Sequence, residues 1–77
     1  MTPEEKEIAT GFMHVVFLPG SWNKRFAQSM IYIAVKQPDQ ELTDSQKEWL
    51  YRLLYTYRKQ IPELYNKYQN NPNCKKL

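Results

Sequence analysis

Residues 42–61 read LTDSQKEWLYRLLYTYRKQI and form the longest regularly spaced segment of the chain. Thr43 and Gln46 have the spacing of a capping box, which marks the start of a helix. Apolar side chains then recur at the spacing of one helix face: Leu50, Leu53, Leu54, Tyr57 and Ile61. The pattern predicts an amphipathic helix over residues 44–61 whose leucine stripe faces a core.

The N-terminal residues predict another helix. Thr2 and Glu5 have capping-box spacing, and a proline occupies the first helical position between them. Apolar residues follow at helical spacing, so we expect a helix over residues 3–17. Two adjacent valines near its end are β-branched, and a strand over residues 12–18 after a shorter helix is the alternative.

Residues 18–21, Leu-Pro-Gly-Ser, predict a type II turn because proline and glycine occupy its two central positions. Ser21 then caps a helix over residues 22–36. Its apolar face consists of Trp22, Phe26, Met30 and Ile33, widened by Ala27, Ile31 and Ala34.

Short connections between three amphipathic segments predict an all-α fold, a small antiparallel three-helix bundle with helices at about 3–17, 22–36 and 44–61. Pro62 ends or kinks the third helix, and residues 63–68 can add a short fourth helical turn. We expect one helical domain over residues 1–69 and a flexible tail over 70–77, because NNPNCKKL offers little to a core.

The composition is that of one small globular domain, with 77 residues, 42% hydrophobic residues and a net charge of +3. The basic excess falls on the second and third helical segments and suits an anionic partner. A single cysteine is typical of a reducing compartment, so we expect a cytoplasmic protein. The apolar runs are too short for a bilayer and the start lacks a signal-peptide pattern, so no membrane partner is expected.

Catalytic and metal-binding patterns are absent from the sequence. His14 and Cys74 are the only histidine and cysteine, and two such residues do not make a ligand set. The carboxylates are explained as helix caps, and His14 reads as a structural or surface residue. The sequence therefore predicts neither an enzyme nor a cofactor nor a metal.

Lys24 and Arg25 lie in the first turn of the second predicted helix, where the helix dipole disfavours cations. Free backbone N–H groups beside two cations would suit a phosphate or a carboxylate. The alternative is that one of these residues pairs with Glu41 or Asp44.

The polar side of the third predicted helix is rich in tyrosine and arginine. Aromatic rings stack on bases while cations hold phosphates, and the same residue types dominate protein–protein hot spots. The alternative is that the tyrosines, among them Tyr51, cover the core with their hydroxyls in water. Trp22 and Trp49 read as rings that close the two ends of the core. The candidate anion- or nucleic-acid-binding residues are Lys24, Arg25, Arg52, Tyr55, Arg58 and Lys59.

Four segments together resemble small helical accessory proteins encoded by bacteria, phages and plasmids: residues 21–26 (SWNKRF), 42–46, 50–53 and 57–61 (YRKQI). The resemblance covers about half of the chain. It implies an accessory protein and transfers no catalytic residue.

The sequence thus supports two functions. The first is a non-enzymatic helical module that binds nucleic acid, or another anionic partner, through a basic surface on helices two and three, with little sequence specificity. The second is a protein–protein adaptor or inhibitor that uses the tyrosine-rich face of helix three.

Overall fold

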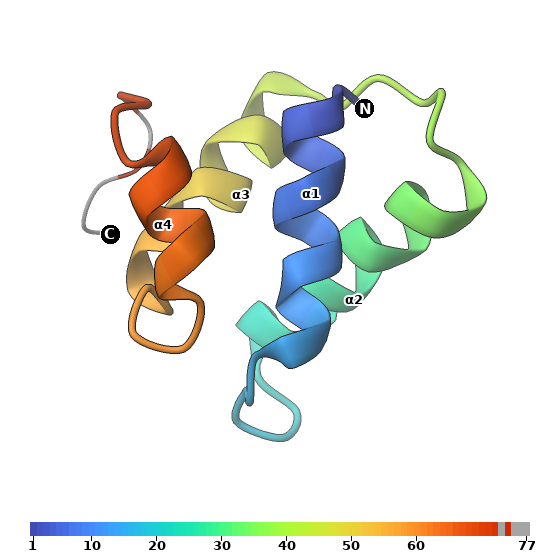
Figure 1. Ribbon diagram of the computed structural model, residues 1–77. Helices are drawn as coiled ribbons and strands as arrows, with labels where there is room; N and C mark the ends of the chain where they lie inside the picture. Colours follow the sequence, from blue (N-terminus) through green and yellow to red (C-terminus); the bar gives the residue numbers. More distant parts are fainter. Residues whose placement is uncertain (73, 75–77) are drawn as a thin grey trace.

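The computed structural model describes residues 1–72 and Cys74. Its elements, in chain order, are α1 (Pro3–Gly11), the 3₁₀ helix η1 (Phe12–His14), α2 (Trp22–Lys36), α3 (Asp44–Thr56) and α4 (Pro62–Tyr68). The described residues contain no strand, which confirms the predicted all-α class. In Figure 1, α1 lies between α2 on one side and α4 on the other.

The first three helices begin where the sequence predicts. The hydroxyls of Thr2 and Thr43 accept hydrogen bonds from the backbone N–H groups of Glu5 and Gln46, whose side chains in turn accept from the N–H groups of the two threonines. The Ser21 hydroxyl caps α2. Both capping boxes and the serine cap are confirmed.

The turn before α2 is also confirmed. The Ser21 N–H donates to the carbonyl of Leu18 at 3.1 Å. Gly20 has a φ angle of +74°, in the left-handed region that a side chain makes unfavourable. Glycine is therefore required at the second central position of this turn.

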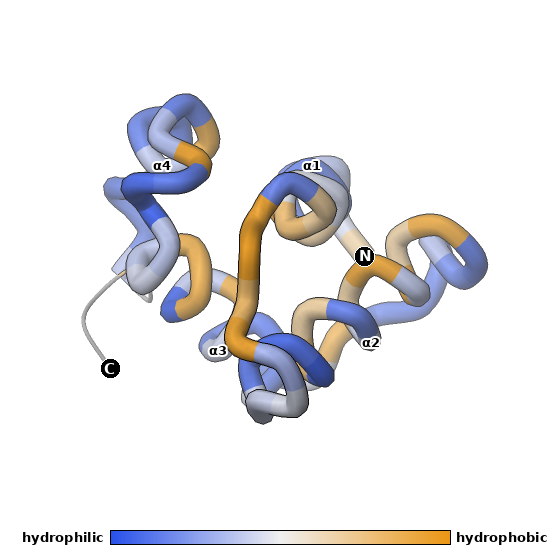
Figure 2. Tube along the Cα trace, turned by 90° about the horizontal axis from the view of Figure 1, so that it is seen from below, coloured by the Kyte–Doolittle hydropathy of each residue, from blue (hydrophilic) through white to orange (hydrophobic). Residues whose placement is uncertain are grey.

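The first helix is shorter than predicted. After η1 the chain becomes extended at Val15, with φ −99° and ψ 136°, so the helix expected over residues 3–17 is wrong beyond His14. The backbone N–H of Val16 donates to the Gln60 side chain at 2.8 Å, and the Gln60 amide donates back to the Val16 carbonyl at 3.3 Å. The extended segment thus pairs with a side chain rather than with a second strand. Figure 2 shows that the extended part of this connection is hydrophobic and that a paler turn follows it before α2.

The third helix is also shorter than predicted, so the helix expected over residues 44–61 is wrong beyond Thr56. α3 ends at Thr56, whose hydroxyl donates to the Arg52 carbonyl at 2.8 Å, and a turn follows. Pro62 disfavours the helical region for the residue before it, and Ile61 has φ −132° and ψ 60°. Pro62 then begins α4, which confirms the predicted fourth helical turn.

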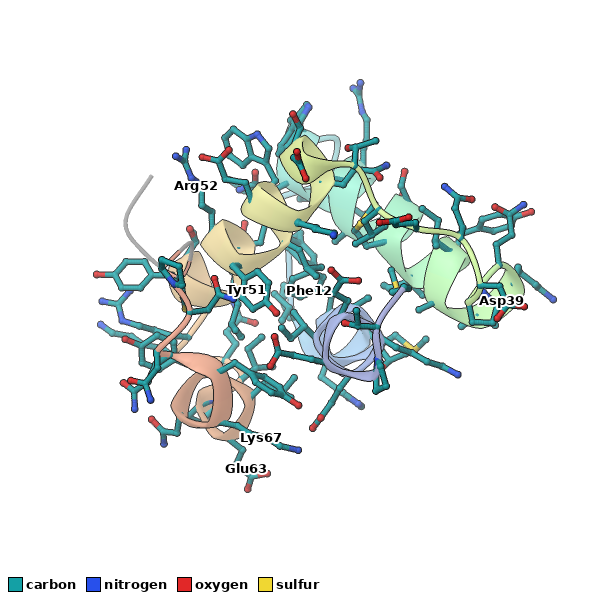
Figure 3. The ribbon with its side chains drawn as sticks, turned by 90° about the horizontal axis from the view of Figure 1, so that it is seen from above. Phe12, Asp39, Tyr51, Arg52, Glu63 and Lys67 are labelled. Carbon is teal, nitrogen blue, oxygen red and sulfur yellow. The ribbon has the colours of Figure 1, made fainter. Side chains whose placement is uncertain are left out.

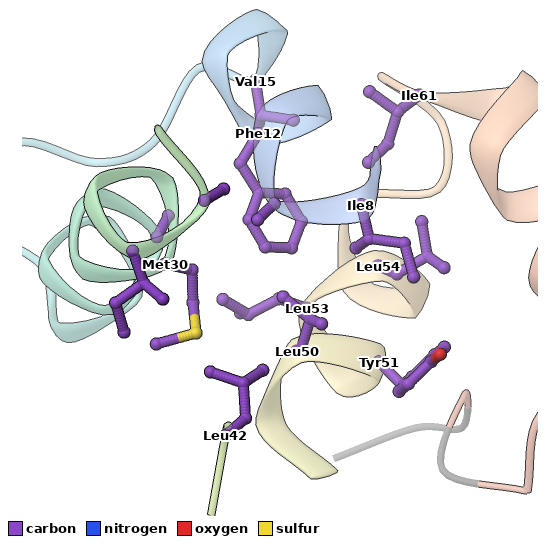
Figure 4. Packing of buried hydrophobic residues seen from close by; sticks show 14 residues of the cluster. Ile8, Phe12, Val15, Met30, Leu42, Leu50, Tyr51, Leu53, Leu54 and Ile61 are labelled. Atoms are coloured by element: carbon purple, nitrogen blue, oxygen red, sulfur yellow. The ribbon is translucent and has the colours of Figure 1, made fainter. Parts of the chain in front are cut away.

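The core lies where α1, α2 and α3 meet (Figure 4). The predicted leucine stripe and Ile61 are buried, so this part of the sequence analysis is confirmed. The buried apolar residues are Ile8, Ala9, Phe12, Val15, Ala27, Met30, Ile33, Ala34, Leu42, Leu50, Tyr51, Leu53, Leu54 and Ile61.

α4 contributes no fully buried residue and is attached by side-chain contacts. A Cβ atom on Gly11 would lie 2.1 Å from a methyl group of Leu64, so glycine lets α4 approach the end of α1. Lys67 Nζ lies 2.9 Å from a carboxylate oxygen of Glu7, and the Tyr68 hydroxyl donates to the same carboxylate. These two partners lower the pKa of Glu7, with the tyrosine hydrogen bond as the larger cause.

The chain after α4 is described only in part, because residues 73 and 75–77 lie outside the described residues. Cys74 is half-buried and packs against the core, and burial raises the pKa of its thiol. The flexible tail over residues 70–77 and the antiparallel order of the helices stay predictions. In the described part of the chain, none of the helices combines the length and the apolar character that crossing a membrane requires.

Candidate functional site

α3 presents two different faces. In Figure 3, Tyr51 points toward Phe12 of η1, whereas Arg52 points away from the core. Tyr51 is buried, and its hydroxyl donates to the Glu4 carboxylate; burial first and this acid second raise the pKa of the hydroxyl. For Tyr51 the structure therefore confirms the alternative reading, in which tyrosines of this helix cover the core, although its hydroxyl bonds to Glu4.

Aromatic and arginine side chains alternate at every third residue along the outer face of α3 and into the turn that follows it. The Arg52 guanidinium lies 5.4 Å from the Trp49 ring centroid, and the Arg58 guanidinium lies 4.3 Å from that of Tyr55. Residues three apart are neighbours on a helix surface, so Trp49, Arg52 and Tyr55 follow one another along α3. Arg58, in the turn after α3, joins them through its contact with Tyr55. Each arginine is held over the ring that precedes it by a cation–π contact.

Aromatic residues of other helices extend this series at both ends. The Trp22 ring of α2 lies 4.8 Å from Trp49, edge to face, and stacks on Phe26 at 5.2 Å. At the other end, Tyr55 contacts Tyr65 of α4 at 6.0 Å. We call Trp22, Trp49, Arg52, Tyr55 and Arg58 the aromatic–arginine row.

The two tryptophans do not close opposite ends of the core, as the sequence analysis expected. They contact each other, and Trp22 remains 52% exposed. Phe26 and Trp49 already hold the Trp22 ring on one side. Stacking of a ligand on its exposed side therefore costs little conformational entropy.

The arginines of the row keep most of their hydrogen-bonding capacity. Arg52 forms an ion pair with Glu48 one turn earlier on α3, and its Nε is buried without an acceptor in the described part of the protein. Arg58 donates from Nη1 to the Tyr55 carbonyl at 3.0 Å. A guanidinium has five N–H donors, so each arginine can still bind an incoming anion.

Lys24 and Arg25 form no ion pair with a described acid, so the pairing with Glu41 or Asp44 is not observed. The one side-chain bond is a long one, 3.4 Å from Arg25 to the Gly20 carbonyl. At 3.6 residues per turn, Arg25 lies about 60° from Trp22 around α2 and Lys24 about 160°. The fold therefore brings Arg25 beside the row and leaves Lys24 on the opposite flank of α2.

Lys59 lies in the turn after α3 and is exposed. Of the six candidate residues, three belong to the row and one adjoins it: Arg52, Tyr55 and Arg58, with Arg25 alongside. The sequence analysis missed the two tryptophans as site residues. The signal for Trp49 was present, because Trp49, Arg52, Tyr55 and Arg58 repeat at intervals of three.

Tyr57 has a structural role. Its hydroxyl accepts a hydrogen bond from Asn23 of α2 at 3.1 Å, and its ring lies 4.7 Å from Phe17. The contact joins the end of α3 to the start of α2. Tyr51 and Tyr57 are thus engaged in packing of the core and of the helix ends, whereas Tyr55 is partly exposed and contacts Arg58 and Tyr65.

In the described residues, no group of three histidine, cysteine, aspartate or glutamate side chains is close enough to hold a metal ion. Comparison of the chain with protein-family models, curated proteins and solved structures finds no match. The chemistry of the row is therefore the basis for a functional assignment.

Proposed function

We propose that this protein binds single-stranded nucleic acid through the aromatic–arginine row. The observation that supports the proposal most is the half-exposed Trp22 ring in contact with Trp49, next to Arg52 and Arg25. Rings of this kind stack on bases, at about 1–3 kcal/mol per base, while neighbouring cations bind the phosphates.

A single strand fits the row better than a duplex does. The rings of Trp22 and Tyr55 offer flat faces, which only unpaired bases can cover. The row itself offers few side chains that could read base edges, so affinity without strong sequence preference is expected from it. A cytoplasmic location suits this function and the single cysteine of the chain.

The adaptor hypothesis has less support from the packing. It relied on several tyrosines of α3, of which Tyr51 is buried and Tyr57 is bonded to Asn23. Fewer aromatic side chains are then free for a protein hot spot.

The proposal is tested by the fluorescence anisotropy of a labelled oligonucleotide, single-stranded or annealed to its complement, titrated with the protein. Single strands should bind more tightly, and the affinity should fall between about 50 and 200 mM salt because cations replace counterions at phosphates. Changing Arg52 and Arg58 together to glutamine should remove most of the binding. It should also make the logarithmic salt slope shallower by about 0.7 for each phosphate that the variant no longer neutralises.

A matched control changes Lys6 and Lys36 to glutamine. Both are exposed, lie outside the row and alter the net charge by the same amount. The control should bind nearly as well as the wild type. The proposal is wrong if the control loses as much affinity as the arginine variant, or if the wild-type protein binds no single strand at low salt.

A further inference from the structure

The outer face of α2 and the loop after it form an open groove of about 540 Å³ next to the row. Its polar lining consists of Arg25, Gln28, Ser29, Tyr32, Gln37 and Gln40. The nearly buried Ile33 lies beneath them. The groove is thus apolar at its base and polar around its rim, and no carboxylate lines it.

The polar groups of this groove are mostly not used by the fold. The side-chain amides of Gln28, Gln37 and Gln40 form no hydrogen bond with a described residue, nor does the Tyr32 hydroxyl. The Tyr32 ring is 56% exposed. An amide presents a donor and an acceptor side by side, which matches a ligand edge that carries an acceptor beside a donor.

The groove is continuous with the row through Arg25. Arg25 lines the groove and follows Trp22 by three residues on the same helix, so the two side chains are neighbours. A strand whose bases stack on Trp22 and Trp49 would pass Arg25 as it enters the groove. Arg25 is then placed to bind the phosphate between the stacked bases and the next nucleotide.

We propose that the groove binds one adenine base of the strand held by the row, an inference that rests on the proposed function. Adenine presents N7 as an acceptor and N6 as a donor, the edge that a glutamine amide pairs with in two hydrogen bonds. Tyr32 supplies the stacking face, and Ile33 supplies the apolar base of the groove. Guanine presents two acceptors on that edge and would require an arginine or lysine, whereas Arg25, the arginine of the groove, is assigned here to the phosphate.

The experiment compares oligothymidines that carry a single adenine, guanine or cytosine in the middle with the all-thymidine strand, by anisotropy at fixed salt. The adenine strand should bind about tenfold more tightly than the all-thymidine strand. The double variant Gln28→Ala, Gln40→Ala should remove this difference and leave the all-thymidine affinity unchanged. Both glutamines are exposed, so a circular dichroism spectrum like that of the wild type should accompany the change.

Gln69→Ala, an exposed glutamine at the end of α4, is the matched control and should keep the preference for adenine. Equal affinities for all strands, a preference for guanine, or a preference for adenine that survives in the double variant would each overturn the role of the groove. In those cases the all-thymidine strand still binds, so the row keeps its function. If no strand binds, both the row and the groove are excluded as nucleic-acid sites.

Discussion

The two faces of α3 have opposite characters although their residues alternate in the sequence. The inner face carries Leu50, Leu53 and Leu54, all fully buried against α1 and α2. The outer face carries arginines stacked on aromatic rings, which remain partly exposed. Burial explains the choice of leucine on the inner face, whereas the fold has no comparable need for an aromatic–arginine series on the outer one.

The inner face of α3 contributes mainly to the stability of the fold, whereas the outer face is the one assigned to binding. Apolar contact in the core is the main source of folding free energy in so small a domain. The contacts of the row are two cation–π pairs, the edge-to-face pair of Trp22 and Trp49 and one partly exposed ion pair, each of which contributes about 1 kcal/mol. Substitutions on the two faces should therefore affect different measurements.

The largest expected effect on stability comes from the inner face. Leu53→Ala should lower the free energy of unfolding by about 2–5 kcal/mol, because it removes buried methyl groups and leaves a cavity. Tyr55→Ala, two residues away on the outer face, should cost much less. Urea unfolding followed by circular dichroism measures both. Equal losses for the two variants would mean that the outer face is also a folding element.

A smaller loss of stability, about 1 kcal/mol, is expected from a change at the N-terminus of α3. Thr43→Ala removes the hydroxyl that caps α3, so stability should fall without a cavity in the core. Ser45→Ala, an exposed residue of the first turn of α3, is the control and should be nearly neutral. The same unfolding curves show whether the threonine cap contributes as the capping box predicts.

Charge reversal at the start of α2 should change stability by only a few tenths of a kcal/mol. Lys24→Glu and Arg25→Glu should each raise the thermal midpoint slightly, because an acid suits the positive end of a helix and neither cation has an acidic partner among the described residues. Arg25→Glu should also weaken oligonucleotide binding, whereas Lys24→Glu should weaken it less, since Lys24 lies on the far flank. Equal losses of binding would contradict the placement of Arg25 beside the row.

The smallest expected effect is a pH dependence of the contact between α4 and α1. The pKa of Glu7 is below its ordinary value of 4.5 because Tyr68 and Lys67 bind its ionised form. The carboxylate therefore favours the docked α4 above pH 4.5, and this contribution is lost as the pH falls through the lowered pKa. Relative to the intrinsic exchange rate at each pH, the protection of the α4 amides should fall below pH 4.5 while that of the α3 amides does not change. In Glu7→Gln, the protection of α4 should be low on both sides of pH 4.5; a protection of α4 that does not depend on pH in the wild type would mean that Glu7 does not hold α4.

The sequence predicted the features that depend on local chemistry. Capping boxes at Thr2 and Thr43, the Pro19–Gly20 turn and the leucine stripe each follow from a few neighbouring residues. Of the six candidate site residues, Arg52 and Tyr55 are neighbours because they lie three residues apart on α3, and Arg58, just beyond α3, contacts Tyr55.

What the sequence could not predict depends on contacts between distant segments. The first helix ends early because Gln60, more than forty residues away, bonds to the backbone of Val16. The burial of Tyr51 depends on Glu4, and the contact of Trp22 with Trp49 depends on how α2 crosses α3. Each of these contacts joins residues whose order in the chain carries no signal of their proximity.

The most direct test of the row uses the intrinsic fluorescence of the protein. The chain contains two tryptophans, and both lie in the row in contact with each other. Base stacking on Trp22 should quench the tryptophan emission on titration with unlabelled oligothymidine at low salt, and added salt should reverse the quenching. In Trp22→Phe the remaining Trp49 emission should respond less. Binding that leaves the emission of the wild-type protein unchanged would contradict the account, because the strand would then lie elsewhere on the protein.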